Sequence, residues 1–162
     1  MRLRLTVLLP CPPEAVVAAL VRTRWLNRLD DPALRFSPVE PARWPELWVP
    51  GRYRVALRVA GGLPIGQHTL DVRRVLGPDD ALGAGETEIW HDAGYSDLIR
   101  TWDHRVVVAE VHGMTRLSDV VEIRAGLLTV PAWLFASVLY RVRGARLTRL
   151  ASAGFAEDAL DG

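Results

Sequence analysis

The feature that most constrains this chain is a long central region in which apolar and polar residues alternate between short groups of turn residues. From Leu34 to Arg124 the period of the pattern is close to two, which places successive side chains on opposite faces of a β-strand. Such closely spaced strands pair in antiparallel order. One long helix is expected after them, from about Val130 to Ala151. Because a sheet with one apolar face must be covered, this helix is predicted to lie across it.

The other expected elements precede or connect these strands. A first strand at Leu3–Leu9 is followed by two short helices, near Glu14–Leu20 and Thr23–Leu29. The later strands are expected near residues 53–59, 65–76, 87–92, 98–111 and 114–124, with a loop over 77–85. Thr129 is the expected N-cap of the last helix. Residues 1–154 are expected to form a single domain, and residues 155–162 a frayed acidic tail.

One hairpin can be given a register from the sequence alone. If His112-Gly113 is a two-residue turn, Val111 faces Met114, and the pairing of both strands follows from this. One face of the pair then carries mostly apolar residues, which supports the register. These residues are Trp102, His104, Val106 and Val108 on one strand and Leu117, Asp119, Val121 and Ile123 on the other. The register predicts that His104 and Asp119 are diagonal neighbours on the apolar side.

Two short motifs accompany this order of elements. They are Trp102-Asp103-His104-Arg105 and Gly113-Met114-Thr115-Arg116-Leu117-Ser118-Asp119, with Gly126 before the last helix. Together with the order of elements, they resemble the START-like helix-grip superfamily, which includes polyketide cyclase/dehydrase-like and SRPBCC ligand-binding proteins. The resemblance implies an α+β helix-grip fold, a curved antiparallel sheet of about seven strands around a long C-terminal helix. It also implies a cavity for a hydrophobic ligand between sheet and helix, but no reaction.

The candidate ligand-binding residues lie on the apolar faces of the strands and on the last helix. They are Tyr53, Val55, Leu57, Trp102, His104, Asp119, Phe135 and Leu139. The helix is expected to cover the sheet with a broad apolar surface made of Leu134, Phe135, Val138, Leu139 and Val142. Trp133 is a further lining candidate, and Tyr140 offers a hydroxyl. The segment Pro41–Gly51, rich in Pro and Trp, is interpreted either as a lid or as a packed surface loop.

Three functions are compatible with these residues. The first is the binding or transport of a small hydrophobic ligand, of the lipid, isoprenoid or polycyclic aromatic class, without catalysis and without a cofactor. The second is a polyketide cyclase/aromatase-like enzyme in which His104 and Asp119 transfer protons. Against it stands the interpretation that this pair only satisfies its own hydrogen bonds. The third is a protein-interaction domain, and the chain is expected to be a monomer or a homodimer.

Composition weakens or excludes several other classes. Lys and Arg number 20 against 19 Asp and Glu, all the basic residues being Arg, so a nucleic-acid-binding surface is not expected. Cys11 is the only cysteine, and the four histidines lack metal-ligand spacing, so no disulfide and no metal site are expected. No stretch reaches the roughly 20 apolar residues that span a bilayer. With no secretory signal pattern at the N-terminus, we expect a cytoplasmic protein.

The last helix carries two further features. Arg141, Arg143, Arg146 and Arg149 are interpreted as a solvated face paired with nearby acidic residues. Gly144 lies inside this helix, where glycine costs about 1 kcal/mol relative to alanine. We interpret it either as a point of close approach to a strand or ligand, or as a bend.

Overall fold

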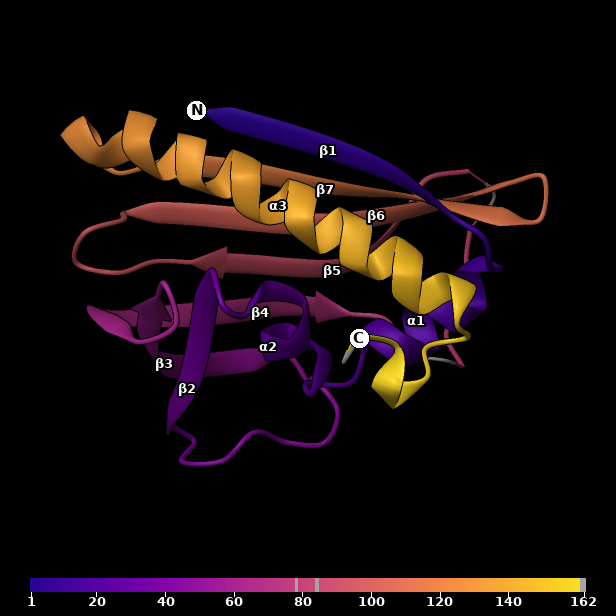
Figure 1. The fold of residues 1–162 in the computed structure, drawn as a ribbon, viewed down its shortest axis with the longest axis horizontal. Coiled ribbons are helices and arrows are strands. Elements are labelled where there is room, and N and C mark those ends of the chain that lie inside the picture. The colour runs from indigo at the N-terminus through magenta and orange to yellow at the C-terminus, as the bar shows by residue number, and fades with distance from the viewer. Residues whose placement is uncertain (78, 84, 161–162) are drawn as a thin grey trace.

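The computed structural model describes residues 1–77, 79–83 and 85–160. Pro78 and Ala84, in the loop expected over residues 77–85, and Asp161 and Gly162, in the expected tail, lie outside the described residues. Figure 1 shows one curved sheet with the long helix α3 (Thr129–Ser152) running diagonally over one face. The described part of the chain contains no helix long and apolar enough to cross a membrane.

The sheet has seven strands, each antiparallel to its neighbours, in the order β1-β7-β6-β5-β4-β3-β2. The strands are β1 (Arg2–Leu9), β2 (Leu34–Glu40), β3 (Gly51–Val59), β4 (Leu63–Val75), β5 (Thr87–Gly94), β6 (Thr101–Val111) and β7 (Met114–Arg124). Two short helices, α1 (Pro13–Leu20) and α2 (Trp25–Asp30), follow β1. The predicted α+β architecture is confirmed. The first strand pairs with the last, so β1 and β2 are the two edge strands of the sheet.

The predicted register of the β6–β7 hairpin is also confirmed. Val111 pairs with Met114, His112 and Gly113 form the turn with positive φ, and His104 pairs with Val121. The predicted apolar face is the inner face, and both His104 and Asp119 are buried on it. The prediction succeeded because a two-residue turn and a period of two leave only one register that buries the apolar residues.

The start of α3 differs from the prediction. Thr129 is the first residue of the helix rather than its N-cap, and its side-chain oxygen accepts a hydrogen bond from the Ala125 N–H at 2.9 Å. Gly126, with φ of 57°, turns the chain into a short 3₁₀ helix, η1 (Gly126–Leu128), before Thr129. Because this turn already has helical geometry, α3 begins from it without a side-chain cap.

The apolar surface expected on α3 is mostly not the buried one. Of the five residues predicted to cover the sheet, only Leu139 is buried, whereas Leu134 and Val138 are 55% and 60% exposed. The helix instead buries a stripe of smaller and mixed residues, namely Ala136, Ser137, Tyr140, Gly144, Leu147 and Ala151. Small residues allow the helix to approach the sheet closely. A Cβ placed at Gly144 would lie 2.8 Å from Val7 Cγ1 on β1, which supports the interpretation of close approach.

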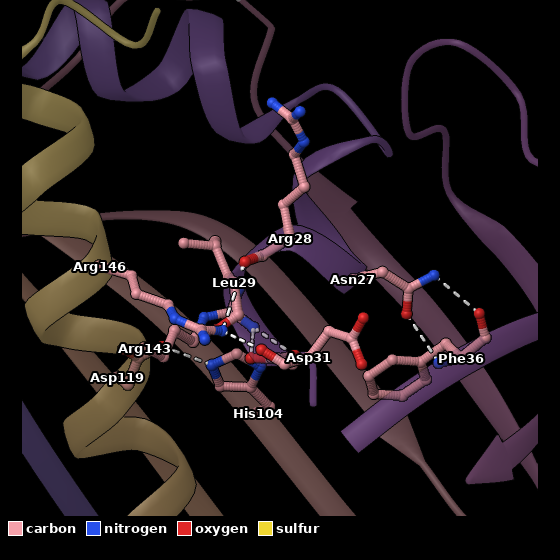
Figure 2. A network of polar contacts seen from close by, with 10 residues as sticks. Asn27, Arg28, Leu29, Asp31, Phe36, His104, Asp119, Arg143 and Arg146 are labelled. Carbon is pink, nitrogen blue, oxygen red and sulfur yellow. Dashed lines mark hydrogen bonds and ion pairs between the residues drawn. The ribbon is translucent and has the colours of Figure 1, made fainter. Parts of the chain in front are cut away.

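The expected solvated arginine face of α3 is wrong for two of its four members. Arg143 pairs with the buried Asp30 of α2, and Arg146 donates hydrogen bonds to backbone carbonyls at the end of α2, including Leu29 O at 2.9 Å. Figure 2 shows both guanidinium groups reaching from α3 toward this region. The carbonyls at a helix C-terminus lack partners within the helix and attract positive charge, so the end of α2 draws in these arginines.

The Pro41–Gly51 segment and the C-terminal tail both pack against the core. In the Pro41–Gly51 segment, Trp48 is buried and its ring lies 5.0 Å from that of Trp90 and 5.1 Å from that of Tyr53. In the tail that we expected to fray, Phe155 contacts the Trp25 ring at 6.4 Å, and Ala159 and Leu160 pack against the hydrophobic core. At these residues the tail is therefore packed, because its apolar side chains cover the end of α3.

Candidate functional site

A cavity of about 320 Å³ lies between α2, α3 and the inner face of the sheet. Its walls are mostly apolar and come from segments far apart in the chain. The apolar part includes Leu29 of α2, Phe36 of β2, Leu70 of β4, Val106 of β6 and Leu139 of α3. Two lining residues near its edge, Ile65 and Phe135, are themselves exposed.

Five of the eight sequence-predicted site residues line this cavity. They are Leu57, Trp102, His104, Phe135 and Leu139. The other three lie behind its wall. The Tyr53 hydroxyl donates to Val49 O at 2.9 Å, Val55 is enclosed in the core formed by β2, β3 and β4, and Asp119 is behind His104. Of the two additional candidates, Tyr140 lines the cavity, whereas Trp133 packs beside β1 and donates from its indole N–H to Arg2 O.

No residue of the Pro41–Gly51 segment is among those that line the cavity. Backbone hydrogen bonds from Trp48 N to Val21 O and from Thr23 N to Glu46 O, at 2.8 and 3.2 Å, fix the segment to the end of α1. The segment therefore has the character of a packed surface loop rather than of a lid.

His104 and Asp119 meet as the register predicted. His104 Nε2 and Asp119 Oδ1 are 2.7 Å apart, and both side chains are buried. The ring of Tyr140 stands edge-on to His104, with centroids 4.9 Å apart, and Figure 2 shows the contact between His104 and Asp119 beneath α3. Burial raises the pKa of the Tyr140 phenol well above its usual value, so this hydroxyl is neutral and can donate a hydrogen bond.

A second buried pair, Asp30 with Arg143, was missed by the sequence analysis. Arg143 Nη1 lies 3.1 Å and 3.3 Å from the two carboxylate oxygens of Asp30, and both residues line the cavity. Burial alone would lower the pKa of Arg143, but the carboxylate of Asp30 outweighs it, so the pKa is raised and the guanidinium stays charged. Because the partners are 113 positions apart in the sequence, no local pattern links them.

A third set of polar groups, His68 of β4 and Asp92 of β5, was also missed as a site. Both line the cavity and are only 5% and 3% exposed. His68 Nδ1 and Asp92 Oδ1 are buried without a hydrogen-bond partner among the described residues. Burial raises the pKa of Asp92 to about 8 and lowers the pKa of His68 to about 4. A useful hint was available, because His68 and Asp92 interrupt otherwise apolar inward positions of their strands.

The described residues contain no group of three or more His, Cys, Asp or Glu side chains that could hold a metal ion. Chemically, the cavity offers an apolar volume with buried hydrogen-bonding groups on its sheet side and beneath α3. Such an arrangement can enclose an apolar molecule and orient it through a small number of polar contacts.

The fold of this chain is similar to that of several solved structures. No protein-family model and no curated protein matches this chain. Among solved structures, it is similar to a protein from Arthrobacter aurescens, with a TM-score of 0.65 and 13% identity over 94% of this chain and 86% of the other. This chain has the helix-grip fold. The resemblance stated from the sequence is thus confirmed at the level of the fold.

Two further structures agree with this assignment. Protein CV1439 from Chromobacterium violaceum has a TM-score of 0.63 and 16% identity, covering 93% of this chain and 96% of its own. The Aha1 dimer from Colwellia psychrerythraea has a TM-score of 0.59 and 13% identity, covering 96% and 99%. At these sequence identities, the similarity concerns the arrangement of the sheet and the helix. It does not extend to the side chains that line the cavity.

Proposed function

We propose that this chain binds a small, mostly apolar molecule, of the lipid, isoprenoid or polycyclic aromatic class, in the cavity between α3 and the sheet. The observation that carries the proposal is the apolar-walled cavity of about 320 Å³ with buried polar groups facing it. Ligand sites typically measure about 300–1,000 Å³ and combine apolar walls with a few placed polar groups. A cavity of this size that served only packing would cost stability, because its lining loses dispersion contacts.

Binding is better supported than catalysis. The Nε2 atom of His104, the atom closest to Asp119, is already used in the bond at 2.7 Å. Ser137, a hydroxyl on the neighbouring turn of α3, donates back to Trp133 O and is therefore committed to the helix. A cyclase-like role for His104 and Asp119 requires a proton-transfer geometry toward a substrate, whereas ligand binding requires only the cavity and its polar groups.

Native mass spectrometry of the purified protein, followed by solvent extraction, tests this proposal. We expect the wild-type chain to carry or take up a fatty acid, a prenol or a polycyclic aromatic from a panel. The variant Ala132→Phe places a large side chain on the α3 wall of the cavity and should reduce this uptake by tenfold or more. The matched control, Ala145→Phe, lies on the exposed side of the same helix and should bind as the wild type does.

Two outcomes would contradict the proposal. One is a wild-type chain that takes up no member of the panel, and the other is equal uptake by Ala132→Phe and the wild type. In the second case the molecules would be bound outside the cavity.

A further inference from the structure

Four of the described residues that line the cavity keep a buried polar atom without a hydrogen-bond partner, namely Trp25, His68, Asp92 and Arg143. Of these, His68 and Asp92 lie next to one another on the sheet. A Cβ built at Gly94 of β5 would be 2.5 Å from His68 Nε2 and 3.2 Å from Asp92 Oδ2. Both side chains therefore flank the same backbone position. The backbone hydrogen bonds between Thr69 and Tyr95, at 2.8 and 3.0 Å, hold β4 and β5 together at this point.

Glycine at residue 94 is explained by this crowding and not by backbone conformation. Its φ is outside the left-handed region that favours glycine, whereas any Cβ would collide with His68 Nε2 and approach Thr69 O to 3.0 Å. The space beside Gly94 is thus occupied by the polar ends of His68 and Asp92, which converge at the cavity wall.

These groups also differ from the other polar groups of the cavity. Asp92 pairs across β5 and β6 with His104, so it lies in the same row of the inner face. His104 has Asp119 as a partner, but Asp92 Oδ1 and His68 Nδ1 have none within the described part of the chain. Buried polar atoms in native proteins are nearly always hydrogen-bonded, and exceptions point to a missing partner such as a ligand.

The charge state of the pair indicates which partner fits. Burial raises the pKa of Asp92 to about 8 and outweighs a hydrogen bond from the backbone N–H of Asp71, which lowers the pKa, so the carboxyl is mostly protonated at neutral pH. Burial lowers the pKa of His68 to about 4, which leaves the imidazole uncharged. Both groups then offer a donor and an acceptor without net charge. An ionised ligand group would be desolvated here without a counter-charge on either residue.

We propose that His68 and Asp92 form a subsite that hydrogen-bonds an uncharged oxygen of the ligand, a hydroxyl, phenol or ketone. The chain would accordingly select such molecules over the same skeleton without the oxygen, and over the corresponding carboxylate. This inference rests on the proposed function, since it specifies the chemistry of a ligand bound in the same cavity. His68 and Asp92 act here as specificity-determining residues.

The test is isothermal titration calorimetry at neutral pH with two matched sets of probes. One set is β-naphthol, β-methylnaphthalene and β-naphthoate, and the other is decanol, decane and decanoate. We expect the wild-type chain to prefer the alcohol or phenol of a set about tenfold over both relatives, as one net buried hydrogen bond provides. In Asp92→Leu and His68→Leu this preference should fall toward onefold, while the affinity for the hydrocarbon is kept or increased.

Three further variants keep the test decisive. Asp92→Asn retains hydrogen-bonding groups without a titratable carboxyl and should retain most of the preference. His91→Leu changes the neighbouring residue of β5, whose side chain bonds Asp103 at 2.9 Å away from the cavity, and should leave the preference intact. Gly94→Ala displaces His68 and should weaken the preference without removing either polar group.

The outcomes separate this inference from the proposed function. Equal binding of all members of a set by the wild type, or a preference that survives in both leucine variants, overturns the subsite while leaving the cavity as a binding site. Absence of binding for both complete sets overturns the proposed function and the subsite together. Thermal unfolding of each variant establishes that it is folded before its affinity is compared.

Discussion

The cavity contains two kinds of buried polar group, which differ in whether the protein supplies their partners. Asp30 with Arg143, and His104 with Asp119, form closed pairs beneath α3 at 3.1 Å and 2.7 Å. His68 and Asp92, one or two strands further along the same sheet face, each keep a buried atom without a partner among the described residues. Folding accounts for the first kind, because each group has the other as its partner, even though Arg143 Nε has no hydrogen-bond partner among the described residues. The second kind lowers the stability of the fold unless another molecule supplies the missing hydrogen-bond partner.

Because buried polar groups of both kinds line this cavity, burial alone does not identify a functional group in this fold. The pair that drew attention from the sequence, His104 with Asp119, is the better satisfied one, whereas the groups left open come from strands that looked ordinary. A search for function in such a cavity is therefore better guided by unmet hydrogen-bonding capacity than by the presence of a histidine next to a carboxylate. Because stability can be measured without knowing the ligand, variants of the two kinds of group can be compared directly by their unfolding.

The largest expected effect comes from opening a closed pair. Arg143→Leu leaves the Asp30 carboxylate buried without its charge partner, and we expect the free energy of unfolding to fall by about 3–5 kcal/mol. Urea unfolding at neutral pH measures it. Arg141→Leu, an exposed position on the same helix, should change stability by less than about 0.5 kcal/mol. If the two variants lose equally little, the Asp30–Arg143 pair is not a closed structural pair.

Crowding the open pair should have the next largest effect. Gly94→Ala forces a Cβ to within 2.5 Å of His68 Nε2, and the resulting rearrangement should cost about 2 kcal/mol. Gly62→Ala is the matched control, because a Cβ there meets nothing within 4 Å. The measurement is the midpoint of urea unfolding for the two variants. A Gly94→Ala chain as stable as Gly62→Ala would show that His68 is free to move away, and that the open pair is not held in place.

The open pair also predicts a pH dependence with a defined sign. Asp92, with a folded pKa of about 8 against an ordinary 3.8, binds a proton that the unfolded chain releases, so its contribution to stability declines as the pH rises from about 4 to about 8. His68, with a folded pKa of about 4 against 6.5, has the opposite effect between those two values. The two trends oppose one another below pH 6.5, and above it only that of Asp92 remains.

Between pH 6.5 and 8 the stability of the wild type and that of Asp92→Asn should therefore diverge through Asp92 alone. Over this interval the wild type is expected to lose about 2 kcal/mol more than the variant, from roughly 1.4 kcal/mol per pH unit for one proton. Urea unfolding of both chains at the two pH values measures the difference, and groups common to both cancel. Parallel pH profiles would mean that Asp92 is ionised in the folded state, which would remove the basis for an uncharged subsite.

The smallest expected effect is a gain in stability. Asp92→Leu removes a buried group with an unmet oxygen, and at pH 6.5 without ligand it should stabilise the fold by about 1 kcal/mol. The same change at Asp119, which has His104 as partner, should instead destabilise by about 2 kcal/mol. If the same substitution stabilises the fold at Asp92 and destabilises it at Asp119, the difference between buried groups with and without a partner is supported. If both substitutions change the free energy of unfolding in the same direction, this difference is contradicted.

The local pattern of the sequence was enough to predict most of the sheet and one contact of the site. Alternation located every strand except β2, for which no bounds were predicted. The His112-Gly113 turn determined the β6–β7 register, which brought His104 beside Asp119. These features are predictable because a strand has a period of two and a tight turn leaves no freedom of pairing. The same local logic located α1 and α2 within one or two residues.

The tertiary structure alone decided which face of α3 is buried and which polar groups meet. Leu134 and Val138 looked like core residues, but the helix approaches β1 through Gly144, and this contact turns Tyr140 and Arg143 inward. Likewise, the register shift between Val72 and Arg74, together with the Thr69–Tyr95 bridge, determines how β4 meets β5, and so where His68 lies relative to Asp92. Helix rotation and strand irregularities depend on the packing of distant segments, which no local period encodes.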